Sequence, residues 1–250
     1  MISYIEKKSF LDIPSLSLID LSFNRLVKIP CDIFTNKLIS HRILSIFLDG
    51  NQISNLVIGD RTIKKLIANN NYLTQFPNVD LLKISLNELN LNNNKLKNIF
   101  KKNFLSFRII YKIFLSKNCL NSIEPNSFDN LFSLKILDLS ENKLARLDSL
   151  LFISLINLEL LKINSNFLET IDKILFYNLV NLKELDLSYN PIKYLEPYCF
   201  SNLKSLFKLY LNANYSILTK KILYGLENIK YIFISSNIYY LNFEFIDHIR

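Results

Sequence analysis

The segment Leu182-Lys183-Glu184-Leu185-Asp186-Leu187-Ser188-Tyr189-Asn190-Pro191-Ile192 sets leucine, asparagine and isoleucine at fixed intervals. Within it, Leu185 and Leu187 flank Asp186, an alternation that predicts a short strand with the leucines directed inward. Asn190 follows this strand, where the chain must turn. Its amide offers a donor and an acceptor to turn backbone that stacking would bury. The segment therefore predicts a strand that ends in an asparagine-supported turn.

The same frame recurs along the chain. From Asn94 to Asn214 its asparagine returns every 24 residues. A unit of this kind is a strand, a turn and a return segment, and it buries its apolar face only by stacking on its neighbours. We therefore expect a ladder of asparagines that serves as scaffold and not as a ligand site. Its members are Asn24, Asn51, Asn71, Asn94, Asn118, Asn142, Asn166, Asn190, Asn214 and Asn237.

A second spine lies ten residues after the asparagine, in the return segment. Its fixed place in the repeat predicts a buried aromatic column rather than a cofactor site. Leucines follow three residues later in four repeats. The spine consists of Phe34, Phe104, Phe128, Phe152, Phe176 and Phe200, followed by Leu131, Leu155, Leu179 and Leu203.

The frame L-x-x-L-x-L-x-x-N-x-L with this phenylalanine resembles the leucine-rich-repeat family in its 24-residue form, over nearly the whole chain. The resemblance implies an α/β solenoid, or horseshoe. A parallel sheet of about ten strands would form the concave face, and turns, 3-10 or short helices the convex face. It implies one domain over residues 1–250, with an incomplete repeat over 1–15, ten repeats over 16–237 and an incomplete return segment over 238–250. Residues with A/T-rich codons dominate, with 24 Lys against 6 Arg, which resembles expanded repeat families of large DNA viruses or intracellular microbes.

Partners of this family usually bind the strand residues that face away from the core, and the repeat phase identifies those positions. Aromatic residues gather there near the C-terminal end, and such side chains are enriched in interface hot spots; alternatively, they only cover the end of the stack. Asp138, Lys162 and Asp186 are interpreted as a salt-bridged recognition row. The residues assigned to partner binding are Phe114, Asp138, Lys162, Asp186, Tyr189, Tyr210, Tyr215, Tyr231 and Phe233.

The net charge of +8 is typical of proteins that bind nucleic acid, but the excess of basic residues does not lie on the predicted binding face. The inner face, counted as the positions six, four, two and one before each asparagine and one after it, carries eight basic and seven acidic residues. The basic surplus therefore falls on return segments and ends, including Lys97–Lys102. No stacking platform is interleaved with that cluster. An arc of ten strands, roughly 45 Å long, suits a protein or peptide partner.

Catalytic and metal-binding patterns are missing from the sequence. His41 and His248 lie near opposite ends, and Cys31, Cys119 and Cys199 are scattered without metal-ligand spacing. The carboxylates Asp138 and Asp186 fall two repeats apart, roughly 10 Å by strand spacing, which is wide for paired acid–base work. We expect no enzyme activity, no cofactor and no metal.

The start of the chain lacks a secretory pattern, no run of 18 uncharged apolar residues occurs, and the cysteines are unclustered. These features favour an intracellular, cytoplasmic location, which would be the host cytoplasm for a viral protein, and no membrane span. The predicted function is a non-catalytic protein–protein interaction module that binds a protein or peptide on its concave face. Two alternatives stay open: a regulatory subunit or inhibitor of an enzyme, and a receptor or adhesion ectodomain fragment.

Overall fold

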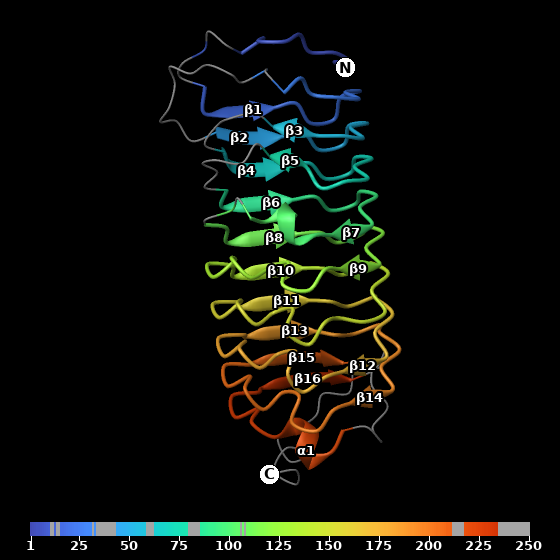
Figure 1. Ribbon diagram of the computed structural model, residues 1–250, viewed down its shortest axis with the longest axis vertical. Coiled ribbons are helices and arrows are strands. Elements are labelled where there is room, and N and C mark those ends of the chain that lie inside the picture. The colour runs from blue at the N-terminus through green and yellow to red at the C-terminus, as the bar shows by residue number, and fades with distance from the viewer. Residues whose placement is uncertain are drawn as a thin grey trace.

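The computed structural model describes residues 1–10, 13, 16–31, 33, 44–58, 63–79, 86–105, 107, 109–211 and 218–234. Over these residues the chain winds into a column of stacked coils, and each coil adds one strand to a continuous parallel sheet (Figure 1). The ten strands, in their order across the sheet, are β1 (Leu18–Asp20), β2 (Leu44–Phe47), β4 (Ile63–Ile67), β6 (Glu88–Asn90), β8 (Lys112–Phe114), β10 (Ile136–Asp138), β11 (Leu160–Lys162), β13 (Glu184–Asp186), β15 (Lys208–Leu211) and β16 (Tyr231–Ile234).

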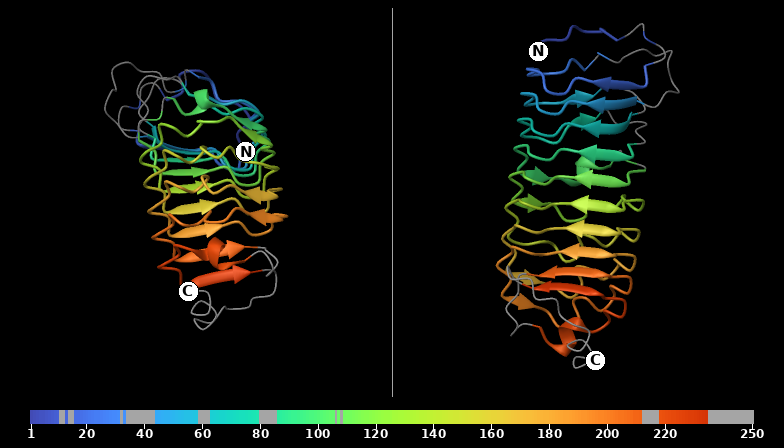
Figure 2. Two further views of the ribbon diagram at one scale, coloured as in Figure 1. Left: turned by 60° about the horizontal axis from the view of Figure 1, so that its bottom comes forward. Right: turned by 180° about the vertical axis from the view of Figure 1, so that it is seen from behind.

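A second row of two-residue strands lies beside the main sheet, where the chain begins its return (Figure 1). Helices are few among the described residues: they are the 3-10 helix η1 (Lys101–Asn103) and the single-turn helix α1 (Lys220–Leu223), and most of the return path is turn (Figure 2). The second row pairs β3 (Val57–Ile58) with β5 (Asn78–Val79), β7 (Asn98–Ile99) with β9 (Ser122–Ile123), and β12 (Thr170–Ile171) with β14 (Tyr194–Leu195).

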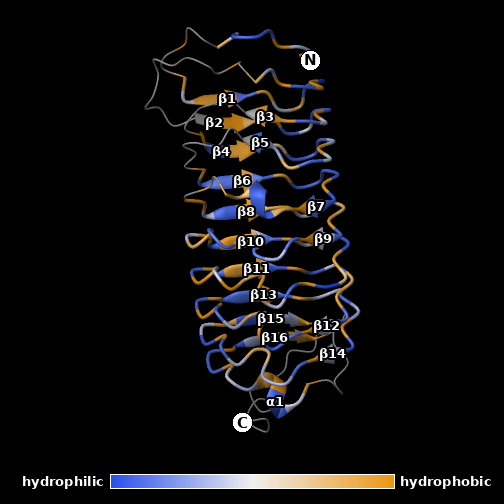
Figure 3. Cartoon of the chain, in the orientation of Figure 1, coloured by the Kyte–Doolittle hydropathy of each residue, from blue (hydrophilic) through white to orange (hydrophobic). Residues whose placement is uncertain are grey.

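Burial alternates along the strands as the pattern predicts. In β10, Leu137 is buried between the half-buried Ile136 and Asp138, and β6, β11 and β13 repeat this pattern. The strands β1, β2 and β4 are drawn mainly in the hydrophobic colour, whereas β6, β8 and β13 are mainly hydrophilic (Figure 3). The predicted solenoid with a ten-strand parallel sheet is confirmed.

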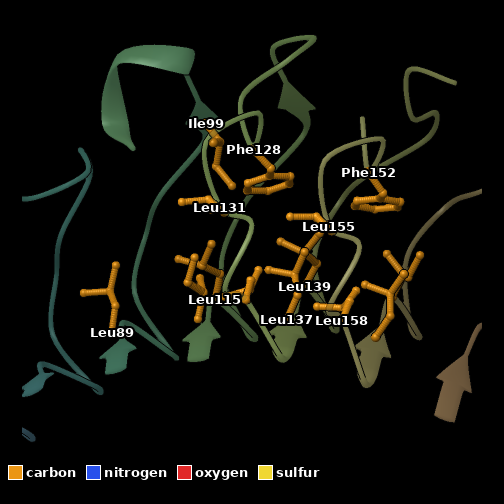
Figure 4. Close-up of a cluster of buried hydrophobic side chains, with 14 of the residues drawn as sticks. Leu89, Ile99, Leu115, Phe128, Leu131, Leu137, Leu139, Phe152, Leu155 and Leu158 are labelled. Carbon is orange, nitrogen blue, oxygen red and sulfur yellow. The ribbon is translucent and has the colours of Figure 1, made fainter. Parts of the chain in front are cut away.

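The core lies between the sheet and the return segments. Figure 4 shows leucines such as Leu115, Leu137 and Leu139 pointing inward from the strands, with the rings of Phe128 and Phe152 on the return side. Phe128, Phe152, Phe176 and Phe200 stack in sequence, with ring centroids 6.1 to 6.4 Å apart. The predicted aromatic spine is confirmed over the described residues, and Phe34 lies outside them.

The asparagine ladder joins each repeat to the one before it. Asn142 Oδ1 accepts the backbone N–H of Leu120 at 3.0 Å, and Asn142 Nδ2 donates to the carbonyl of Leu115 at 2.9 Å. The same amide also donates to two carbonyls of its own turn, those of Leu139 and Ser140. Each such side chain therefore satisfies backbone groups that stacking removes from water. The asparagines with these bonds are Asn51, Asn71, Asn94, Asn118, Asn142, Asn166 and Asn190.

Candidate partner-binding surface

The parallel register aligns one outward residue of every strand in a single row across the sheet, here called the central row. Asp138 lies opposite Lys162, and Lys162 lies opposite Asp186. The face that carries this row is called the sheet face. The central row consists of Asp20, Phe47, Ile67, Asn90, Phe114, Asp138, Lys162, Asp186, Tyr210 and Phe233.

Six of the residues assigned to binding from the sequence fall in this row: Phe114, Asp138, Lys162, Asp186, Tyr210 and Phe233. Tyr231 lies in the adjacent row, opposite Lys208. Tyr189 lies in the turn after β13, and Tyr215 lies outside the described residues. The repeat phase therefore predicts which side chains share the sheet face, because each strand keeps the same register with the next.

The carboxylates of the central row are held by serines two residues later. Asp186 Oδ1 accepts the N–H of Ser188 at 3.0 Å and its hydroxyl at 2.6 Å. Asp138 Oδ1 accepts the same pair of bonds from Ser140, at 2.9 and 2.6 Å. In each case one oxygen serves the scaffold, and the second oxygen has no other hydrogen bond within the described residues.

The prediction that Asp138, Lys162 and Asp186 form a salt-bridged row is wrong. Among the ion pairs within 4.0 Å that the described residues form, none joins Lys162 to Asp138 or Asp186. The serines already hold the two carboxylates, which explains why they remain near their own turns. The row thus presents separate negative, positive and negative groups instead of a neutralised chain of ion pairs.

Asparagine makes the same scaffold bond in the central row, where Asn90 Oδ1 accepts the N–H of Asn92, two residues later, at 3.2 Å. Other side-chain oxygens of the face accept an N–H from the next repeat. Asn69 Oδ1 accepts the N–H of Asn92, and Asn92 Oδ1 accepts the N–H of Ser116, at 3.0 and 2.7 Å. In the preceding repeat, Asp49 Oδ1 accepts the N–H of Asn69 at 2.8 Å. Aspartate and asparagine both offer this oxygen, so the scaffold is indifferent to the choice between them. The remaining group is an acceptor oxygen or a donor amide, and this choice sets the chemistry of the surface.

A polar trough of about 530 Å³ hollows the middle of the sheet face. Two of its charged residues, Lys117 and Glu141, pair at 3.6 Å, whereas Asp138, Lys162 and Asp186 form no ion pair with any described residue. The remaining lining groups are amides and hydroxyls. They belong to Asn69, Asn70, Asn92, Asn93, Ser116, Ser140 and Asn164.

The aromatic residues of the last two strands form a contiguous cluster at one end of the trough. The ring of Tyr210 lies on that of Phe233, with centroids 4.4 Å apart and planes at 7°. Tyr231 lies 6.3 Å from Phe233 and meets Phe207 edge-on at 5.3 Å. Tyr231 remains 41% exposed, so the cluster contributes apolar surface to this end of the face.

Phe207 is a member of this cluster that sequence reasoning missed. Strict alternation back from Leu209 would direct it into the core, but β15 begins only at Lys208 and the ring meets Tyr231 instead. The aromatic sequence Phe207, Tyr210, Tyr231 and Phe233 is the signal that could have found it.

Burial raises the pKa of Tyr210, and the nearby charges of Glu184 and Asp186 raise it further.

Tyr189 lies in a strained position at the rim. Its φ is +52°, in the left-handed region that bulky residues rarely adopt, and its side chain is 62% exposed. Asn70 and Asn93 take the same conformation at the equivalent place in their repeats. No ring contact joins Tyr189 to the aromatic cluster within the described part of the chain. The rim therefore adds an isolated exposed ring to the candidate surface.

The described residues hold no cluster of metal-ligating side chains. Within the described ranges, no three His, Cys, Asp or Glu residues lie close enough to share a metal ion. Cys199 is buried, and burial raises the pKa of its thiol to about 12, which suppresses the reactive thiolate. Over the same ranges, no helix has the length and apolar character needed to cross a membrane.

Comparison with known proteins agrees with this geometry. A family model described as leucine rich repeat matches residues 84–144 and 156–215. A leucine-rich-repeat protein of Leptospira interrogans has 26% sequence identity and a TM-score of 0.60, over 86% of this chain and 59% of that chain. The chain thus spans less than two thirds of that protein.

A second similar structure is the octameric complex of Latrophilin 3, Unc5D and the leucine-rich repeats of FLRT2. It has 18% identity and a TM-score of 0.65, over 90% of this chain and 78% of that chain, and at this identity it bears on the fold alone. No curated protein matches the chain. The repeat frame, the ladder, the ten-strand sheet and the family match agree. The chain belongs to the leucine-rich-repeat family.

Proposed function

We propose that this chain is a non-catalytic interaction module that binds a protein or peptide on its sheet face. Leucine-rich-repeat domains are typically protein-interaction modules. The observation that carries the proposal for this chain is that the two carboxylate oxygens of Asp138, and likewise those of Asp186, differ in their contacts. One oxygen of each is fixed by a serine, and the rest of the group is left for a partner.

Charge gives the surface its selectivity. A bound segment would meet Asp138, Lys162 and Asp186 at successive strands, about 4.8 Å apart. A partner with basic groups flanking an acidic or acceptor group matches this order. Because none of the three side chains forms an ion pair with a described residue, a partner can pair with all three without breaking an internal ion pair. The carboxylates are also held in place before binding, which lowers the entropy that binding must overcome.

The aromatic cluster supplies the apolar part of the interface. Tyr210 and Phe233 continue the central row directly from Asp186, so one extended segment can reach both the charged and the aromatic groups. From Phe114 to Phe233 the row crosses six strands, which corresponds to about 24 Å and about seven residues of extended peptide. Ringed side chains beside a charged row resemble the composition of interface hot spots.

We also propose an intracellular location, which the three free cysteines support. Cys31 is exposed, Cys119 is half-buried and Cys199 is buried, and none is in a disulfide. Unpaired thiols persist in reducing compartments.

The function is tested by capture of partners from cell lysate on immobilised chain, followed by quantitative mass spectrometry. The sheet-face variant combines Asp186→Asn with Tyr210→Ala. The matched control is Tyr177→Ala, which removes an exposed tyrosine from a return segment. Proteins that the wild type and the control retain, and that the sheet-face variant loses, support the proposal. Equal retention by all three forms contradicts it.

A further inference from the structure

A second hollow, of about 580 Å³, lies away from the central row, beside the segment 74–78 that leads into β5 and beside β7 with the residues that follow it. Its volume is within the range of small-molecule sites, about 300–1,000 Å³. Three rings and two lysines dominate its wall. The lining residues are Thr74, Gln75, Phe76, Pro77, Asn78, Lys97, Asn98, Phe100, Lys102, Asn103 and Phe107.

An irregularity in the repeat explains the rings. The residue ten positions after Asn71 is a leucine and not the spine phenylalanine, whereas Phe76 comes five residues earlier. Phe76 packs edge-on against Phe104, with centroids 5.0 Å apart, and so meets the end of the spine from another direction. Phe107 replaces the leucine of later repeats and lies 5.8 Å from Phe104. The displaced rings leave an apolar wall beside the return segments.

Among the described residues that line the hollow, the charged side chains are both lysines. Lys97 and Lys102 form no ion pair within 4.0 Å with any residue that the structure describes. Lys101, between them in sequence, is instead bound to Asp129 at 3.6 Å and does not line the hollow. The two lining ammonium groups are therefore available to an anion.

Amide groups add neutral donors. Asn103 Oδ1 accepts the N–H of Phe100 at 2.7 Å, and Asn98 Oδ1 accepts the hydroxyl of Ser122 at 2.7 Å. Each oxygen is thus occupied, and each Nδ2 remains a donor among the lining residues. Lys102 Nζ lies 5.5 Å from the centroid of Phe100.

We propose that this hollow binds a small organic anion, a carboxylate or phosphate carried on an apolar body. Lys97 and Lys102 hold the anionic group, and Phe76, Phe100 and Phe107 pack against the body. Two ammonium groups and amide donors, with no carboxylate among the described lining residues, complement negative charge, and the rings favour a ligand with an apolar body over a bare inorganic ion. This site is separate from the sheet face, and the proposal does not depend on the function proposed for the sheet face.

The test is isothermal titration of the full chain with 4-phenylbutyrate and with phenyl phosphate, which distinguish the two anionic groups. Neutral 4-phenylbutanol, inorganic phosphate and a short oligothymidylate serve as comparisons. We expect one or both aryl anions to bind. Lys97→Gln and Lys102→Gln should each weaken that binding by about tenfold or more, as the loss of a charge-assisted hydrogen bond predicts. Lys101→Gln, whose ammonium is already paired, should leave it unchanged.

Four outcomes would overturn the proposal. Equal binding of the alcohol removes the need for an anion, and equal binding of inorganic phosphate removes the role of the rings. An equal loss with Lys101→Gln reduces the effect to general charge. Binding of the oligothymidylate without either aryl anion points to nucleic acid instead. Phe100→Leu, at a ring 45% exposed, supplies a variant that changes the wall with little effect on the core.

Discussion

Ser188 holds Asp186 by two hydrogen bonds, from its backbone N–H at 3.0 Å and from its hydroxyl at 2.6 Å, and both end on the same carboxylate oxygen. The other oxygen forms no such bond to the scaffold among the residues described. Asp138 and Ser140 repeat the arrangement two strands away. Fold and surface chemistry are therefore carried by different atoms of one side chain, and substitutions can separate them.

Asp186→Asn should keep both serine bonds, because the amide oxygen accepts as the carboxylate does. We expect the melting temperature to stay within about 1 °C of the wild type. Asp186→Ala leaves the N–H of Ser188 without its acceptor and should cost about 1 kcal/mol, or roughly 2–4 °C in a chain of this size. Thermal unfolding followed by circular dichroism compares the three forms. Equal losses for Asn and Ala would show that the charge, and not the oxygen, supports the turn.

The ladder should respond in the opposite way. Asn142 Nδ2 faces the carbonyls of Leu115, Leu139 and Ser140, so Asn142→Asp sets an oxygen against three others. Asn142→Ala only removes the bonds. Both should destabilise, Ala by about 3 kcal/mol and Asp by more at neutral pH. Urea unfolding gives the free energy of unfolding of each variant and so shows which substitution costs more. A less damaging Asp would contradict the assigned orientation of the amide.

The repeat frame predicts the fold almost completely, because each consequence follows from a fixed period. It predicts the rows on the sheet face for the same reason, as the Phe114-to-Phe233 row shows. It does not predict that Ser140 and Ser188 would hold the aspartates, since a spacing of two residues does not reveal a side-chain bond. The prediction of ion pairs between Lys162 and these aspartates is wrong for this reason.

Irregular repeats escape prediction because the period no longer applies to them. Phe76 stands outside the spine position in the sequence, yet its ring contacts Phe104. Phe207 lies one residue before its strand, where alternation has not begun, and its ring turns toward Tyr231. The identity of a partner has no periodic signature at all, since it depends on the side chains that the frame leaves variable.

Tyr189→Asn should raise stability and lower partner capture together. Asparagine tolerates the left-handed conformation that Tyr189 adopts at φ +52°, as Asn70 and Asn93 show in the same position. Relief of this strain should raise the melting temperature by roughly 1–4 °C. The variant also removes an exposed ring from the rim. Differential scanning calorimetry and lysate capture test the two effects. Ser165, which has φ +55° at the same place in its repeat, supplies the control for strain alone as Ser165→Asn. A fall in stability would contradict the strain.

Asp49→Asn should stabilise the chain at neutral pH. Burial is the main cause that raises the pKa of Asp49, and the charge of Asp20 adds to it. The folded state therefore binds the proton more tightly, and the charged carboxylate destabilises it at pH values above the folded pKa. As pH falls through that pKa the penalty disappears, so the advantage of Asn should shrink toward pH 4. Melting temperatures of the wild type and of Asp49→Asn, measured from neutral pH down to about pH 4, give the difference in stability between them.

Asp20 offers a matched control of opposite sign. The hydrogen bonds of Ser22 lower the pKa of Asp20, so its charge stabilises the folded state above the unfolded pKa and that benefit is lost as pH falls. Asp20→Asn should therefore lower the melting temperature slightly at neutral pH, with a gap that closes in acid. The same sign for both variants would contradict the assigned environments.

Photocrosslinking shows whether partners bind the sheet face. Phe114 on the central row and Phe132 on a return segment are each replaced, in separate chains, by benzoylphenylalanine, a change of similar shape at both sites. Both chains are irradiated in cell lysate, and crosslinked proteins are identified by mass spectrometry. If partners bind the sheet face, position 114 gives specific crosslinks that are absent from position 132. Crosslinks to the same protein from position 132 alone would contradict binding on the sheet face.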